Sequence, residues 1–99
     1  MKKGGYVYIM SNTHRTVLYI GVTSNLEMRV YQHETSFYKG FTKKYNCHDL
    51  IYYEIFDRIE PAIAREKAMK KWNRLWKERQ IKTLNPEMRS LNNEISSFN

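Results

Sequence analysis

Two short segments near the start of the chain alternate aromatic and aliphatic side chains in the manner of β-strands. Residues 6–10 read Tyr-Val-Tyr-Ile-Met and residues 17–22 read Val-Leu-Tyr-Ile-Gly-Val, a composition that favours strands. The polar, turn-forming residues 11–16 separate them, so we expect an antiparallel hairpin. A register that pairs Tyr8 with Tyr19 keeps the aliphatic residues on one face and places these two phenols side by side on the other.

A helix is predicted directly after this hairpin. Residues 24–27 read Ser-Asn-Leu-Glu, which has the spacing of a capping box with Ser24 as the N-cap. We expect this helix to run to about Phe37. It would place Arg29 and His33, which are four residues apart, on one face.

The second half of the chain predicts one more strand and one long helix. Residues 50–56 are apolar on both faces, as is typical of a central strand. Pro61 suits the first turn of a helix, which we expect over about residues 61–80, before Asn85-Pro86. The positions expected to be buried in this helix are Ala64, Ala68, Trp72, Leu75 and Trp76.

Together these elements predict an α/β domain of the α+β type, with helices flanking a small three-stranded antiparallel sheet. The 99 residues suffice for one core. We assign residues 1–86 to the domain and residues 87–99 to a helical or frayed extension of it. No apolar run approaches the roughly 20 residues of a membrane-spanning helix, and no secretory signal is recognisable. The single cysteine excludes an internal disulfide, so a reduced, cytoplasmic setting is expected.

The charge of the chain indicates a polyanionic partner. Lysine and arginine number 17 against 10 acidic residues, which gives a net charge of +7 and points most simply to nucleic acid. Residues 65–82 hold much of this excess. The alternative is that these charges only solvate an exposed helix face. The side chains expected to contact phosphates are Lys43, Lys44, Lys67, Lys70, Lys71 and Arg74.

Two short strings carry the candidate chemistry. Tyr-Val-Tyr ends at Tyr8, and Tyr-Ile-Gly begins eleven residues later at Tyr19. The pair resembles the signature of the GIY-YIG endonuclease family, with Tyr-Val-Tyr in place of Gly-Ile-Tyr. The chain looks like the small single-domain bacterial branch related to the excision-repair nuclease subunit (UPF0213-like). The six positions that agree in order with the family are Tyr8, Tyr19, Arg29, His33, Glu66 and Asn85.

The resemblance implies single-metal hydrolysis of a DNA phosphodiester. Glu66 would bind Mg²⁺ or Mn²⁺, whose remaining ligands would be waters and phosphate oxygens. Arg29 would clamp the scissile phosphate with its planar, permanently charged guanidinium. Tyr8 or Tyr19 would accept the proton of the attacking water. We favour Tyr8, with Tyr19 as its orienting partner.

Three of the six positions also have a purely structural explanation. Glu66 can instead form a helix salt bridge with Lys70, worth about 0.3–0.5 kcal/mol. His33 can relay a proton, bind a phosphate oxygen or make only a local hydrogen bond. Asn85 can order the site or cap a helix. Val22 replaces a lysine of repair-type members and so removes one proton acceptor or phosphate contact.

The function predicted from these residues is a Mg²⁺-dependent DNA endonuclease. Sequence preference should be low, because phosphate contacts position a protein without specifying bases. The alternative is a noncatalytic nucleic-acid-binding accessory module on the same fold, and RNA stays open as a substrate. We expect no membrane partner and no small-molecule cofactor. One active site cuts one strand at a time. A homodimer, or association with a larger repair partner, is therefore also possible.

Overall fold

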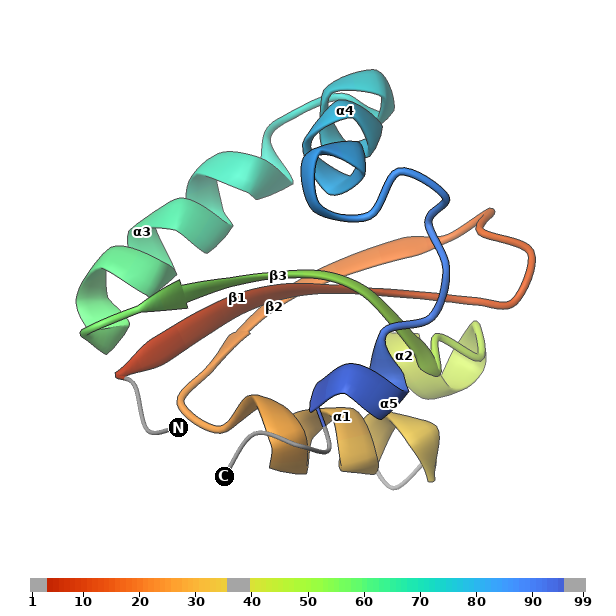
Figure 1. The fold of residues 1–99 in the computed structure, drawn as a ribbon, viewed down its shortest axis with the longest axis horizontal. Coiled ribbons are helices and arrows are strands. Elements are labelled where there is room, and N and C mark those ends of the chain that lie inside the picture. Colours follow the sequence, from red (N-terminus) through yellow and green to blue (C-terminus); the bar gives the residue numbers. More distant parts are fainter. Residues whose placement is uncertain (1–3, 36–39, 96–99) are drawn as a thin grey trace.

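The computed structural model describes residues 4–35 and 40–95. Helices lie on both faces of a three-stranded sheet (Figure 1). In chain order the elements are β1 (Gly5–Ser11), β2 (Leu18–Thr23), α1 (Leu26–Glu34), α2 (Phe41–Lys44), β3 (Asp49–Phe56), α3 (Ile59–Lys70), α4 (Arg74–Leu84) and α5 (Asn92–Ile95). The predicted fold class, an antiparallel three-stranded sheet flanked by helices, is confirmed.

The sheet has the order β2-β1-β3, so β1 is the central strand. The prediction that residues 50–56 form the central strand is therefore wrong. Every residue of β1 is buried, whereas Ile55 of β3 is 38% exposed. Because helices cover both faces of the sheet (Figure 1), an edge strand such as β3 is apolar on both faces as well.

The hairpin register differs from the predicted one by two residues. Tyr8 pairs with Gly21, and Met10 pairs with Tyr19. The turn explains the difference: the Asn12 side chain accepts a hydrogen bond from the Val17 amide, so pairing begins at the ends of the turn. A shift of two residues preserves the faces of a strand. Tyr8 and Tyr19 therefore share a face, as expected, but they sit diagonally.

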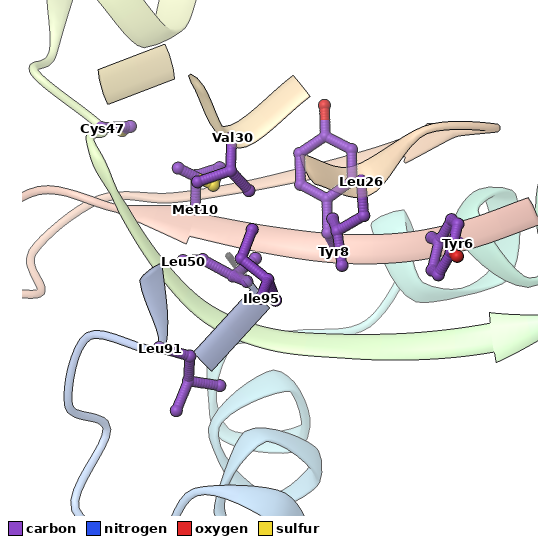
Figure 2. Packing of buried hydrophobic residues seen from close by; sticks show 9 residues of the cluster. All are labelled: Tyr6, Tyr8, Met10, Leu26, Val30, Cys47, Leu50, Leu91 and Ile95. Carbon is purple, nitrogen blue, oxygen red and sulfur yellow. The ribbon is translucent and has the colours of Figure 1, made fainter. Parts of the chain in front are cut away.

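Each face of the sheet carries its own core. Tyr6, Tyr8 and Met10 of β1 point toward α1 and α5, where they pack with Leu26 and Val30 (Figure 2). The alternate β1 residues point toward α3 and α4 on the opposite face (Figure 1). The buried residues of that second core are Val7, Ile9, Ile20, Ile51, Tyr52, Ala62, Met69 and Ile81.

Helix α1 begins one residue later than predicted. Its N-cap is Asn25, whose side chain accepts a hydrogen bond from the Met28 amide. The Thr23 hydroxyl accepts a hydrogen bond from the Asn25 amide, which holds Asn25 in the extended conformation of an N-cap. The helix ends at Glu34, and the predicted end at Phe37 lies outside the described residues.

The long helix predicted over residues 61–80 is two helices, and the prediction of a single helix is wrong. The break falls at residues 71–73, because the Asn73 side chain caps α4 by accepting a hydrogen bond from the Trp76 amide. A break rotates the buried face away from a continuous helical period. Four of the five positions expected to be buried are exposed. The break accounts for the two that follow it, whereas the two that precede it lie off the α3 face that buries Ala62, Glu66 and Met69. Those exposed positions are Ala64, Ala68, Leu75 and Trp76, while Trp72 is half-buried.

The segment after α4 completes the core on the α1 side. Leu91 and Ile95 are buried in the cluster that contains Tyr8, and the Leu91 amide donates to the Leu50 carbonyl at 2.7 Å. Across residues 4–35 and 40–95, the helices are all too short or too polar to cross a bilayer.

Candidate active site

Three aromatic rings from three elements meet on the α1 side of the sheet. Tyr8 comes from β1, Tyr19 from β2 and His33 from α1. The ring centroids lie 6.4 Å apart for the two tyrosines, 5.7 Å for Tyr8 and His33, and 5.8 Å for Tyr19 and His33. We call these three residues the three-ring cluster. It unites three positions that the sequence spacing singled out.

Gly21 makes room for the Tyr8 ring. It stands opposite Tyr8 in the hairpin register, and a Cβ at this position would lie 2.4 Å from both Cζ and the hydroxyl oxygen of Tyr8. No side chain fits at that distance. The glycine of the Tyr-Ile-Gly string therefore allows the ring of one strand to lean over the backbone of the next.

The members of the cluster differ sharply in burial. Tyr8 is 0% exposed and His33 is 1% exposed, and Tyr8 lies deep beside Leu26 (Figure 2). Tyr19 is only partly buried and packs against the edge of the same core. Of the three rings, Tyr19 is the one that solvent or a substrate can reach.

His33 is a neutral group at physiological pH. Burial, aided by the nearby charges of Arg29 and His48, lowers its pKa from 6.5 to about 4. Its Nε2 lies 3.3 Å from the Tyr8 hydroxyl and forms a hydrogen bond with it. A neutral imidazole has one donor and one acceptor nitrogen, so His33 orients the buried phenol and supplies no positive charge for a phosphate.

Arg29 occupies the turn of α1 that precedes His33. It is half-buried, and its charge contributes to the lowered pKa of His33. Arg29 thus places a cation one helical turn from His33, on the face of α1 that the sequence predicts for both.

Glu66 lies buried on α3 with an exposed fraction of 9%. Its Oε2 is 2.7 Å from Nζ of Lys70, so the salt bridge considered from the sequence is present. Hydrogen bonding to Glu66 raises the pKa of Lys70, and the charge of Tyr19 adds a smaller increase. Helix α3, which carries Glu66 and Lys70, packs against β2, the strand that carries Tyr19.

Glu66 is the carboxylate that a metal ion at this edge would use. Within the described residues, no group of three or more His, Cys, Asp or Glu is arranged to hold a metal. A single carboxylate matches the donor set of Mg²⁺, which keeps several waters and binds substrate phosphates. The Lys70 side chain is 54% exposed and can leave the carboxylate by rotating into solvent.

Asn85 has a structural role in this fold. It is buried at the C-terminus of α4, where its amide nitrogen donates to the carbonyls of Ile51 and Arg89. Its side-chain oxygen accepts from the Arg89 amide. These bonds fasten the segment after α4 to β3, and the structure does not bring the Asn85 amide to the three-ring cluster.

The predicted phosphate-binding residues fall into two groups on opposite sides of the sheet (Figure 1). Lys43 and Lys44 are exposed on α2, beside α1, and Lys44 stacks on Tyr45 at 5.4 Å. The α3 side carries the other members of the set. The exposed ones at the end of α3 are Lys67, Lys70 and Lys71.

Arg74 makes hydrogen bonds that stabilise the fold. It donates to Glu78 at 2.7 Å and to the Thr16 carbonyl at 2.9 Å, and it also bonds the Arg15 carbonyl. These contacts tie the start of α4 to the hairpin turn. Val22, at the position of the family's lysine, packs against the core on the α3 side.

An antiparallel sheet with phenols on adjacent strands, an arginine–histidine helix and a glutamate helix are the elements that the resemblance to the GIY-YIG family implied. In agreement, the model of the GIY-YIG catalytic domain matches residues 4–80. The chain belongs to the GIY-YIG family, whose members are nucleases.

Several curated relatives are UPF0213 proteins. One from Natronomonas pharaonis is 36% identical over 76 residues, which cover 77% of this chain and 88% of the relative. One from Syntrophus aciditrophicus is 36% identical over 83 residues, or 83% of this chain and 93% of the relative. One from Streptococcus pyogenes serotype M5 is 33% identical over 69 residues, or 70% and 74%. No solved structure matches the chain significantly.

Proposed function

We propose that the protein is a metal-dependent DNA endonuclease that hydrolyses a phosphodiester bond with low sequence specificity. The observation that carries this proposal is the three-ring cluster, in which Tyr19 is the accessible phenol. Tyr19 lies on the strand against which α3, the helix of Glu66 and Lys70, packs. Membership of a nuclease family supports the proposal.

Tyr19 is the residue we assign to the attacking water. The sequence favoured Tyr8 as the base, but Tyr8 is wholly buried and bonded to His33. An ordinary tyrosine has a pKa near 10, and nearby positive charge favours its phenolate. Arg29, and a metal ion held by Glu66, would supply such a charge.

Tyr8 and His33 act as positioning residues in this proposal. Their hydrogen bond is buried, and the low pKa of His33 keeps the imidazole neutral through the range in which nucleases work. Both rings contact Tyr19 at centroid distances near 6 Å. They therefore limit the orientations that the Tyr19 ring can adopt, which favours a productive geometry for the reaction.

Arg29 and Glu66 complete the site. The Arg29 guanidinium would bind two oxygens of the scissile phosphate and stabilise the charge that develops there. Glu66 would bind Mg²⁺ or Mn²⁺, and such an ion supplies Lewis-acid stabilisation of the leaving oxygen. The exposed lysines at the end of α3 would hold flanking phosphates. A second copy of the chain or a repair partner would cut the opposite strand.

A cleavage panel tests the proposal. Duplex, single-stranded and branched DNA, and RNA, are incubated with the purified protein in Mg²⁺ or Mn²⁺. We expect cleavage of DNA, and a loss of about 100-fold or more in Glu66→Gln and in Arg29→Ala. The matched control is Glu60→Gln, which removes an exposed carboxylate from the first turn of the same helix and should cleave like the parent.

Two results would overturn the proposal. One is a folded parent protein that binds DNA but cuts none of these substrates, which would favour the noncatalytic binding module. The other is a Glu66→Gln variant as active as the Glu60→Gln control.

A further inference from the structure

A shallow groove of about 300 Å³ runs along α4, and its lining is unusual for an exposed helix. The groove is lined by Trp72, Trp76, Arg79, Gln80 and Thr83. Trp76, Gln80 and Thr83 are three to four residues apart, which places them on one face of α4, and Trp72 precedes this helix. Both tryptophans of the chain are therefore in this groove, although the sequence predicted both as core residues.

One wall of the groove is held in place by the fold. The Arg65 guanidinium lies 5.0 Å from the Trp72 ring centroid and is fixed by two 3.0 Å hydrogen bonds to Glu54. Gln80 donates to the Tyr52 hydroxyl at 2.9 Å. A groove with such a wall exists before any ligand arrives, so binding costs little ordering entropy.

The other wall is an exposed aromatic ring. Trp76 is 54% exposed, although it lies in the first turn of α4 directly after the Asn73 cap. Leu75 beside it is 56% exposed. Together these two residues give the groove an apolar rim that faces solvent.

The charge around the groove selects the ligand. Arg79 is exposed, and within the described part of the chain no carboxylate forms an ion pair with it. The one acidic residue of segment 71–82, Glu78, is already paired with Arg74. Aromatic faces flanked by free cations are the features that bind single-stranded nucleic acid, in which bases stack on rings and cations hold the backbone. An acidic or apolar peptide would not need two indole faces in a preformed slot.

We propose that this groove binds an unpaired nucleobase of single-stranded DNA, which stacks on Trp76 while Arg79 contacts the adjacent phosphate. In a duplex the bases are stacked on one another and cannot enter the groove. The proposal rests on the proposed function in one respect, the choice of DNA as the strand. Joined to that function, it makes the substrate a DNA with unpaired nucleotides, such as a flap or a gap.

Tryptophan fluorescence tests the proposal directly, because both indoles line the groove. The parent, Trp76→Ala and the control Leu75→Ala are titrated with a dT12 oligonucleotide in EDTA, so that cleavage plays no part. Affinity is measured in parallel by anisotropy of a labelled oligonucleotide. We expect the parent fluorescence to be quenched and Trp76→Ala to bind about 5- to 150-fold more weakly, as expected for loss of one stacked base. Leu75→Ala should bind within about twofold of the parent.

Three further arms make the outcome decisive. A blunt duplex should bind Trp76→Ala and Leu75→Ala equally, and Arg79→Gln should weaken dT12 binding with a smaller salt dependence. Equal dT12 affinity of Trp76→Ala and Leu75→Ala, or binding without quenching, would overturn the proposal. Tighter binding of rU12 than of dT12 would overturn the choice of DNA. If dT12 quenches the fluorescence of a protein that cleaves no substrate, the proposed binding groove is supported and only the proposed nuclease activity is refuted.

Discussion

Acidification should destabilise the protein through His33. This ring is 1% exposed, is bonded to Tyr8, and has a pKa of about 4 in the folded protein against 6.5 for an ordinary histidine. The unfolded chain therefore takes up a proton at a higher pH than the folded one. The contribution of His33 to stability is complete above pH 6.5 and is lost as the pH falls from 6.5 toward 4.

The size of this effect follows from the two pKa values. Each tenfold change in proton affinity is worth about 1.4 kcal/mol, so the drop from 6.5 to about 4 corresponds to roughly 3 kcal/mol. A domain of this size has a free energy of unfolding of about 5–15 kcal/mol. His33 alone would thus remove a large share of the stability.

Urea unfolding between pH 7.5 and pH 4 measures the effect. The variant His33→Gln keeps a polar group beside Tyr8 but cannot titrate. Between pH 7.5 and pH 4, its free energy of unfolding should therefore fall by about 3 kcal/mol less than that of the parent. His14→Gln, in the exposed hairpin turn, is the control and should decline like the parent. The reasoning would be refuted by an identical decline in His33→Gln, or by an NMR titration that gives His33 a pKa of 6 or higher.

Three other predictions concern single side chains. Gly21→Ala places a Cβ 2.4 Å from the Tyr8 ring and should cost about 3 kcal/mol in urea unfolding; adding Tyr8→Leu should relieve it, and strict additivity of the two changes would count against the clash. Asn85→Ala removes three hydrogen bonds to the main chain and should cost about 3 kcal/mol, so a change below about 0.5 kcal/mol would contradict its structural role. Lys70→Met frees the Glu66 carboxylate and should tighten Mn²⁺ binding several-fold by calorimetry. Unchanged or weaker binding would argue against Glu66 as the ligand.

The sequence predicts the sheet well because alternation assigns faces independently of register. Tyr8 and Tyr19 share a face in both the predicted and the observed pairing, which differ by two residues. The register itself depends on how the Asn12 side chain closes the turn, and strand periodicity carries no information about that contact.

The helices show where local signals compete. A helical pattern continues through residues 71–73, but the Asn73 cap divides it and leaves Trp76 in solvent. Asparagine is a strong N-cap, so this break had a signal that the apolar pattern concealed. In the same way, Asn25 displaced Ser24 as the cap of α1.

The sequence predicted that three of the six candidate site residues meet, but not which of them solvent can reach. Spacing along the strands and α1 brought Tyr8, Tyr19 and His33 to one cluster. Which phenol is accessible depends on the packing of α1 and of the segment after α4 over Tyr8. These contacts join residues far apart in the chain, and no local pattern encodes them.

The proposed division of labour between the two phenols is tested most directly by pH–rate profiles of single-turnover DNA cleavage by Tyr19→Phe and Tyr8→Phe. Both variants keep an aromatic ring and lose only a hydroxyl. If Tyr19 accepts the proton of water, the cleavage rate of the parent should increase at alkaline pH, where the phenolate forms. Tyr19→Phe will then lose about 100-fold or more in rate and will not show that increase. Tyr8→Phe will then lose less than about tenfold and keep that increase. The reverse pattern, with the larger loss and the altered profile in Tyr8→Phe, would contradict the account.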